Sequence, residues 1–224
     1  MRDSGFHPFG GRLNPDDPYL SYHDVRLTRE DIRTLKDDWL TDNSISFWEE
    51  YLEREHLAKE HTAHIVLLRP SMSFLLMQTA NPDTLKTALP DFKRTTHIFL
   101  PINDCQNPNL AEGGSHWSLL LVSVLDGIAF HYDSLCPANH AEAEVATYKL
   151  SQLMRRPLKC LDLPDSPRQE NSSDCGVFVC IQMRHLLLKK LLMVESEQQE
   201  GRGEEKVVSI PVQRFEAAEA DSLM

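Results

Sequence analysis

A cysteine at the start of an apolar segment is the strongest chemical signal in the sequence. Cys175 follows a polar loop, residues 165–174, and opens a segment whose first two turns are apolar nearly all round, which predicts a buried helix. The first peptide N–H groups of a helix have no internal partners and carry partial positive charge. A thiolate is stabilised there, so we expect Cys175 to be a nucleophile, with Gly176 leaving space beside its sulfur.

The other four cysteines are expected to be small core residues with free thiols. Cys180 lies about 140° around the helix from Cys175, so the two cannot face one cleft. The odd number and irregular spacing of the cysteines are typical of reduced thiols, and no C-x-x-C pair is present to suggest a metal site. The sequence therefore predicts no structural metal. The remaining members of this group are Cys105, Cys136 and Cys160.

A histidine and an aspartate lie at the two ends of a predicted hairpin. Residues 118–124 and 128–132 are rich in strand-forming residues and flank Asp-Gly at 126–127, a dipeptide typical of hairpin turns. His116 precedes the first strand and Asp133 follows the second. A thiol nucleophile needs an imidazole to accept its proton and later protonate the leaving amine, and a third group to orient that imidazole. We assign these roles to His116 and Asp133, and expect the other nine histidines to be surface residues.

The register of this hairpin decides whether the two side chains can meet. A two-residue turn at 126–127 places Asp133 opposite Leu120, so that His116 and Asp133 point to the same side of the sheet. They do not pair directly in this register. A bulge, a wider turn or strong twist must therefore bring them together.

Gln169, six residues before Cys175, completes the predicted site. Its amide can donate to a developing oxyanion together with the backbone N–H of Cys175. One such donor contributes a factor of about 10²–10³ in rate.

The elements that must position these residues alternate irregularly, which indicates an α+β fold. Thr28 is a predicted N-cap with Asp31 three residues on, and a second helix follows Asp42. In that second helix, apolar residues recur at helical spacing, and we expect the acidic residues Glu49, Glu50 and Glu53 to lie on its opposite side. Further strands are predicted at 64–68, 97–102 and 159–163, and further helices at 71–80, 83–89 and 140–154.

Composition and charge restrict the function classes. The chain has 224 residues, 41% of them hydrophobic, and a formal net charge of −11, which argues against binding nucleic acid or an anionic membrane. No apolar run reaches the length of about 18–20 residues that a membrane span needs, and the N-terminus has no secretory signal. We expect a mobile arm at 1–18, one domain at 19–194 and an acidic, disordered tail at 195–224, in the cytosol, the nucleus or both.

Four separated motifs resemble the Ulp/SENP (sentrin-specific protease) family of cysteine peptidases. They are Trp39-Leu40-x-Asp42-x-x-Ile45, His116-Trp117-Ser118, Asp133-Ser134 and Gln169-x-Asn171-x-x-Asp174-Cys175-Gly176. Within the family the chain is most similar to the deneddylase branch, because the connection at 103–115 is long. The stretch Phe130-His131-Tyr132-Asp133-Ser134 also fits that branch.

The resemblance implies a papain-like α+β architecture, with a mixed or antiparallel sheet packed on a helix that bears the nucleophile. It implies no cofactor. Trp39 and Trp117 would roof a channel for the C-terminal Gly-Gly of a ubiquitin-like modifier, and Asp42 would contact a basic residue in the modifier's tail. The expected reaction is cleavage after Gly-Gly, chiefly deneddylation of target proteins.

Other functions are left open by the sequence. The same chemistry could act on sumo or ubiquitin, or the chain could be a catalytically inactive module that binds the modifier. A Cys-His acetyltransferase is a remote further alternative. The chain departs from the family after Met193, where the closing helical segment of the deneddylase branch is not recognisable.

Overall fold

The computed structural model describes residues 14–60, 62–107 and 113–193. The predicted acidic tail and most of the predicted N-terminal arm lie outside these residues. Residues 14–18 contain a turn, in which the backbone N–H of Asp17 donates to the carbonyl of Asn14, and Asp17 in turn accepts from Arg29.

Two sheets and five α-helices make up the described part of the chain. The strands are β1 (Pro18–Tyr22), β2 (Val25–Thr28), β3 (Ile65–Leu67), β4 (His97–Asn103), β5 (Trp117–Ser123), β6 (Ile128–Tyr132) and β7 (Lys159–Asp162). The helices are α1 (Arg29–Asp37), α2 (Asp42–Glu55), α3 (Pro70–Gln78), α4 (His140–Met154) and α5 (Cys175–His185). Three 3₁₀ turns, η1 (Leu57–Lys59), η2 (Pro82–Leu85) and η3 (Phe92–Arg94), and a π-helical continuation of α5, η4 (Leu186–Leu192), complete the set.

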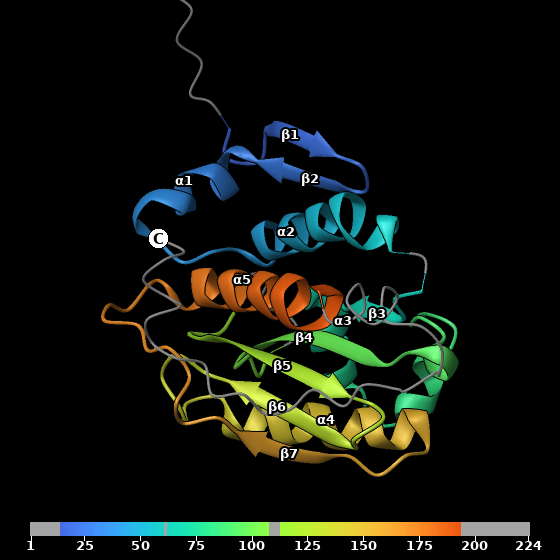
Figure 1. Ribbon diagram of the computed structural model, residues 1–224. Helices are drawn as coiled ribbons and strands as arrows, with labels where there is room; N and C mark the ends of the chain where they lie inside the picture. The colour runs from blue at the N-terminus through green and yellow to red at the C-terminus, as the bar shows by residue number, and fades with distance from the viewer. Residues whose placement is uncertain (1–13, 61, 108–112, 194–224) are drawn as a thin grey trace, which may run out of the picture.

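A mixed five-stranded sheet forms the centre of the molecule. Its strand order is β3-β4-β5-β6-β7, with parallel pairs at the two edges and antiparallel pairs between them. Helix α5 lies across one face with α2 stacked on it, and α4 lies across the other face (Figure 1). Side chains alternate accordingly: Phe99, Leu119 and Leu121 pack toward α5, whereas Leu100 and Leu120 pack toward α3 and α4. The predicted α+β architecture, with a buried helix that begins at the cysteine, is confirmed.

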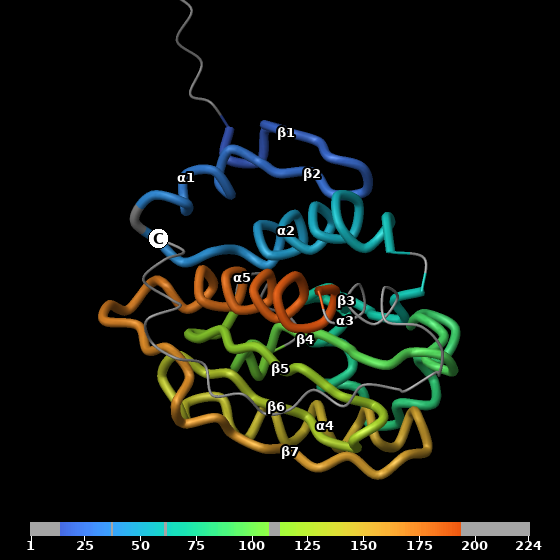
Figure 2. Tube along the Cα trace, in the orientation of Figure 1, coloured from blue at the N-terminus to red at the C-terminus, as the bar shows by residue number. Residues whose placement is uncertain are grey.

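Hydrogen bonds of Asp31 connect the start of α1 to the start of α2. The predicted capping box is present, because Asp31 N–H donates to Thr28 Oγ1 (3.3 Å) while Thr28 N–H donates to the Asp31 carboxylate (2.6 Å). The same carboxylate accepts hydrogen bonds from Thr41 Oγ1 (2.6 Å) and Asn43 Nδ2 (2.7 Å) at the start of α2. Asp31 therefore links the start of α1 to the C-terminal end of residues 38–41, the segment that passes over the beginning of α5 in Figure 2.

The register of the hairpin differs by two residues from that of a two-residue turn, and the wider turn, one of the three alternatives, is the one present. Ser123 pairs with Ile128 and Leu119 with Tyr132, so the turn spans the four residues 124–127 rather than two. Continuing this register places Asp133 opposite Ser118, two residues from His116 instead of four. The wider turn keeps both side chains on one face and shortens the gap between them.

The expectation for the acidic side of α2 is wrong. Glu49 and Glu50 are buried (0% and 2% exposed), and Arg69 at the junction of β3 and α3 lies beside them. Arg69 Nη2 lies 2.5 Å from Glu50 and 2.6 Å from Glu53, and Nη1 lies 3.6 Å from Glu49. Among the described residues, no helix is long and apolar enough to cross a membrane.

Candidate active site

His116 and Asp133 form a buried pair at one end of the central sheet. His116 Nε2 lies 2.6 Å from Asp133 Oδ1, and the two side chains are 5% and 0% exposed. The carboxylate also accepts the backbone N–H groups of Leu135 (2.9 Å) and Asn139 (3.0 Å). Burial raises the pKa of Asp133, but these donors outweigh it and hold the pKa below its usual value. The carboxylate is therefore fixed and ionised beside the imidazole.

Cys175 is the first residue of α5 and approaches the same imidazole. Burial lowers the pKa of His116, but the hydrogen bond to Asp133 and then the interaction with Cys175 outweigh burial and raise the pKa to about 9. Within the described residues, His116 Nδ1 is buried and has no aligned hydrogen-bond partner. We read the Cys175–His116 contact as a close approach rather than an aligned hydrogen bond, which is common in catalytic pairs without substrate.

Gln169 is anchored on the strand end that carries Asp133. Its side-chain oxygen accepts from Ser134 Oγ (2.6 Å), and its backbone N–H donates to the carbonyl of Ser134 (3.3 Å). One amide hydrogen donates to the carbonyl of Asn171 (2.7 Å), which leaves the second amide hydrogen for another acceptor. Asn171 itself orders the turn before α5 by accepting from the backbone N–H of Asp174 (2.9 Å).

Both predicted channel tryptophans are tied to the segment between α1 and α2. Trp39 Nε1 donates to the carbonyl of Ser172 (2.8 Å) in the turn before α5, and Trp117 Nε1 donates to the carbonyl of Leu40 (3.1 Å). Trp39 remains 40% exposed. A Cβ added to Gly176 would lie 2.8 Å from Leu40 Cβ, so the glycine allows α5 to approach this segment closely. Residues 38–41 thus contact both the start of α5 and the start of β5.

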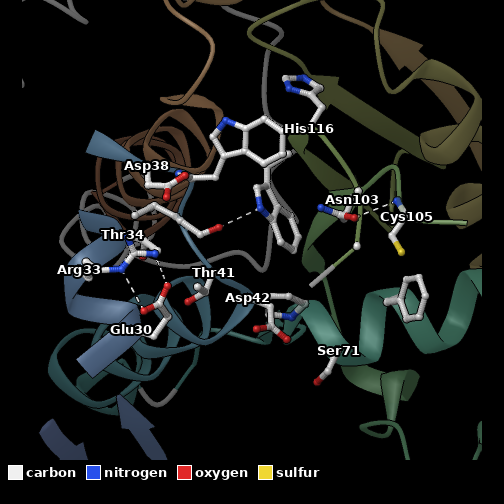
Figure 3. Close-up of a pocket in the computed structure, with 17 residues that line it drawn as sticks. Glu30, Arg33, Thr34, Asp38, Thr41, Asp42, Ser71, Asn103, Cys105 and His116 are labelled. Atoms are coloured by element: carbon white, nitrogen blue, oxygen red, sulfur yellow. Dashed lines mark hydrogen bonds and ion pairs between the residues drawn. The ribbon is translucent and has the colours of Figure 1, made fainter. Parts of the chain in front are cut away.

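A cavity of about 460 Å³ opens beside His116 and Trp117. Its walls come from α1, the start of α2, α3 and the loop after β4, and Figure 3 shows His116 at one end with Asp42 and Ser71 at the other. Asp42 is solvent-exposed at this wall, yet desolvation raises its pKa, as expected for a carboxyl group in a recess.

The support for His116 from the preceding loop was not predicted from the sequence. Asp104 accepts the backbone N–H of His116 (3.0 Å) and both the N–H and the hydroxyl of Ser115 (2.5 Å each). Gly114 adopts a φ of +93°, and a Cβ there would lie 2.1 Å from Asn103 Oδ1. Gly-Gly-Ser immediately before the histidine, at the end of the loop that Asp104 begins, is the signal that could have identified this turn.

Among the described residues, the expectation that the other histidines lie at the surface is wrong for three of them, because His185 at the end of α5 is also buried. His131 is 0% exposed and His97 is 6% exposed. His131 lies two residues before Asp133 on the same strand face, so the strand alternation that placed Asp133 could also have placed His131 inside the protein.

A thiol, an imidazole and a carboxylate gathered at one end of a mixed sheet form the arrangement of papain-like thiol peptidases. The profile described as "Ulp1 protease family, C-terminal catalytic domain" matches residues 38–198. The chain belongs to this family. The predicted family resemblance is therefore confirmed.

Named relatives and solved structures agree with this membership. The chain is 36% identical to NEDD8-specific protease 2 of Schizosaccharomyces pombe over 77% of its own length and 42% of that protein. It is 33% identical to sentrin-specific protease 8 of Homo sapiens over 73% of its own length and 78% of that protein. The chain thus spans about two fifths of the two S. pombe relatives it matches.

The fold is shared with the C-terminal Ulp1 protease domain solved in complex with Smt3, the yeast orthologue of SUMO. That likeness has a TM-score of 0.58 at 22% identity and covers 78% of this chain and 77% of the other. At this identity the comparison concerns the fold alone.

Proposed function

We propose that the chain is a thiol peptidase that cleaves after the C-terminal Gly-Gly of a ubiquitin-like modifier, and that the modifier is NEDD8. The observation that carries the proposal is the buried His116–Asp133 pair with Cys175 beside it at the start of α5. The choice of NEDD8 is supported by relatives named NEDD8-specific proteases in S. pombe, each 36% identical to this chain. Its partners would be the modifier and its conjugates.

The proposed reaction proceeds through an acyl-enzyme. The Cys175 thiolate attacks the carbonyl carbon of the terminal glycine, and the resulting oxyanion accepts hydrogen bonds from Gln169 Nε2 and the Cys175 N–H. The C–N bond breaks as the His116 imidazolium gives its proton to the leaving amine. Water then attacks the thioester, with its proton accepted by His116, and releases the modifier's carboxylate and the thiolate. Asp133 orients the imidazole and stabilises its charge throughout.

Substrate selection would come from the two tryptophans and the cavity beside them. Indole walls formed by Trp39 and Trp117 leave room for glycines but exclude larger side chains at the last two positions. The cavity would hold the preceding residues of the modifier's tail. Asp42 at the cavity wall would pair with a basic residue of that tail.

A panel of modifier fusions tests the proposal. NEDD8, sumo and ubiquitin, each joined through its C-terminal glycine to a fluorogenic amine, would be compared by kcat/KM. We expect NEDD8 to be preferred and Cys175→Ala to abolish hydrolysis. A preference for sumo or ubiquitin would overturn the choice of modifier, and hydrolysis by Cys175→Ala would overturn the mechanism.

A modifier that ends in an electrophile separates an enzyme from an inactive binding module. We expect a covalent adduct at Cys175 with the wild-type chain. Binding without an adduct would favour the inactive module. Chelators are expected to leave the rate unchanged, and loss of activity that zinc restored would contradict this.

We further propose that residues 19–194 form the catalytic unit and that the protein works in the cytosol or nucleus. All five cysteines are free, which supports a reducing compartment. Fluorescence imaging of a tagged full chain would test the location.

A further inference from the structure

A second Ser-His-Asp arrangement, whose serine and histidine are buried, lies behind the proposed active site. His131 Nδ1 is 2.7 Å from Asp162 Oδ1 on β7, and His131 Nε2 is 2.9 Å from Ser118 Oγ on β5. His131 is 0% and Ser118 is 1% exposed, so no substrate can reach this arrangement. We therefore look for its role in the further contact of Ser118, which is with Asn139.

Ser118 connects this arrangement to Asn139, the residue that caps α4. Asn139 Nδ2 lies 3.2 Å from Ser118 Oγ and 3.3 Å from the carbonyl oxygen of His116, and the backbone N–H of Asn139 donates to Asp133 Oδ2 (3.0 Å). Asn139 thus touches both members of the proposed His116–Asp133 pair. It is 1% exposed, so each of these contacts is shielded from water.

The direction of the hydrogen bonds follows from the chemistry of the groups. The Asp162 carboxylate accepts, so His131 Nδ1 carries a proton, and in the neutral imidazole Nε2 is then an acceptor. The Ser118 hydroxyl then donates to Nε2, which leaves its oxygen to accept from the Asn139 amide. Asp162 Oδ2 also lies 2.6 Å from Nδ1 of His140, the neighbour of Asn139 in the chain. Asn139 is thereby held at its side chain by Ser118 and at its backbone N–H by Asp133.

We propose that His131 is a positioning residue for the Cys175–His116–Asp133 chemistry, acting through Ser118 and Asn139. This inference rests on the proposed function but is distinct from it. It predicts that loss of the Ser118 hydroxyl loosens Asn139 and, through it, the His116–Asp133 pair.

Two serines on β5 provide a matched comparison. Ser118 and Ser123 are each 1% exposed, and the Ser123 hydroxyl donates to Asp126 (2.5 Å) at the opposite end of the strand. We expect Ser118→Ala to lower kcat for a NEDD8 fusion on the order of tenfold, with KM changed less than about twofold, since misplaced catalytic groups cost rate. Ser123→Ala should leave both constants near the wild-type values.

A second readout does not depend on any modifier. The titration midpoint of the His116 imidazole, followed by NMR, should move to lower pH in Ser118→Ala, because a looser Asp133 contact stabilises the imidazolium less. Ser123→Ala should not move it. If the wild-type chain cleaves no modifier, the proposed function fails, but this comparison still decides the inference. Equal midpoints in Ser118→Ala and Ser123→Ala would overturn it.

Two substitutions of His131 test the route through Ser118. Glutamine can present an acceptor near the place of Nε2, whereas asparagine reaches only the place of Nδ1. We expect His131→Gln to retain a wild-type-like His116 midpoint and His131→Asn to lose it, with thermal unfolding confirming that both variants fold. Equal midpoints in the two variants would contradict the route.

Discussion

At the scale of single residues, the pKa of His116 sets the pH range of the proposed reaction. The pKa is raised to about 9, so the imidazolium that must protonate the leaving amine persists through neutral pH. We expect kcat/KM to fall as pH rises through about 9, where His116 loses this proton. Profiles of kcat/KM against pH, measured with a modifier fusion, would check the alkaline limb.

Asp133→Asn provides the control for this assignment. The asparagine keeps the size of the side chain but removes the charge that stabilises the imidazolium. The alkaline limb should therefore move to lower pH, together with a large loss of rate. An unchanged alkaline limb in this variant would mean that another group controls it.

At the scale of elements, the contact between α5 and residues 38–41 depends on Gly176. Replacing glycine with alanine inside a helix normally stabilises it by about 0.5–1 kcal/mol. Here the new Cβ would lie 2.8 Å from Leu40 Cβ and 3.2 Å from Leu40 Cγ, and overpacking costs about 1–3 kcal/mol. We expect the clash to dominate, so Gly176→Ala should lower the free energy of unfolding measured by urea denaturation.

The same variant should also affect binding, because Leu40 carries the carbonyl that accepts from Trp117. A shift of this segment changes the proposed channel, so KM for a modifier fusion should rise. Val177→Ala, at a partly exposed neighbouring position on α5, is the control and should leave KM unchanged. A Gly176→Ala protein that is more stable than wild type, with the same KM, would show that Leu40 relaxes freely.

The elements also show what the sequence could and could not specify. Alternation along two strands placed His116 and Asp133 on one face, because that argument needs only the parity of the register. The actual register depended on a four-residue turn, which Asp-Gly at 126–127 did not reveal. The contacts of Asn139 with Ser118 and with the His116 carbonyl join residues that are 21 and 23 positions apart, and no local pattern encodes them.

At the scale of the whole molecule, the buried cluster around Arg69 joins α2 to the junction of β3 and α3. Glu49 is 0% exposed, and burial raises its pKa well above the usual value, with Arg69 only partly opposing this. The folded state therefore favours the protonated form. Because the folded pKa exceeds that of the unfolded chain, the stability associated with this group is present at low pH and is lost as pH rises above about 4.5.

Glu49→Gln tests this pH dependence of folding. Glutamine resembles the protonated carboxyl group in size and polarity but cannot ionise. As pH rises from about 5 to about 8, wild type should lose stability relative to Glu49→Gln. The free energy of unfolding of Glu49→Gln, measured by urea denaturation, should therefore increase relative to that of wild type. Glu53→Gln, at a side chain that is 33% exposed beside the same arginine, is the control and should show a smaller dependence. A difference between Glu49→Gln and wild type that stays constant over this range would mean that Arg69 keeps Glu49 ionised in the folded protein, and that the cluster is held by charge rather than by a buried proton.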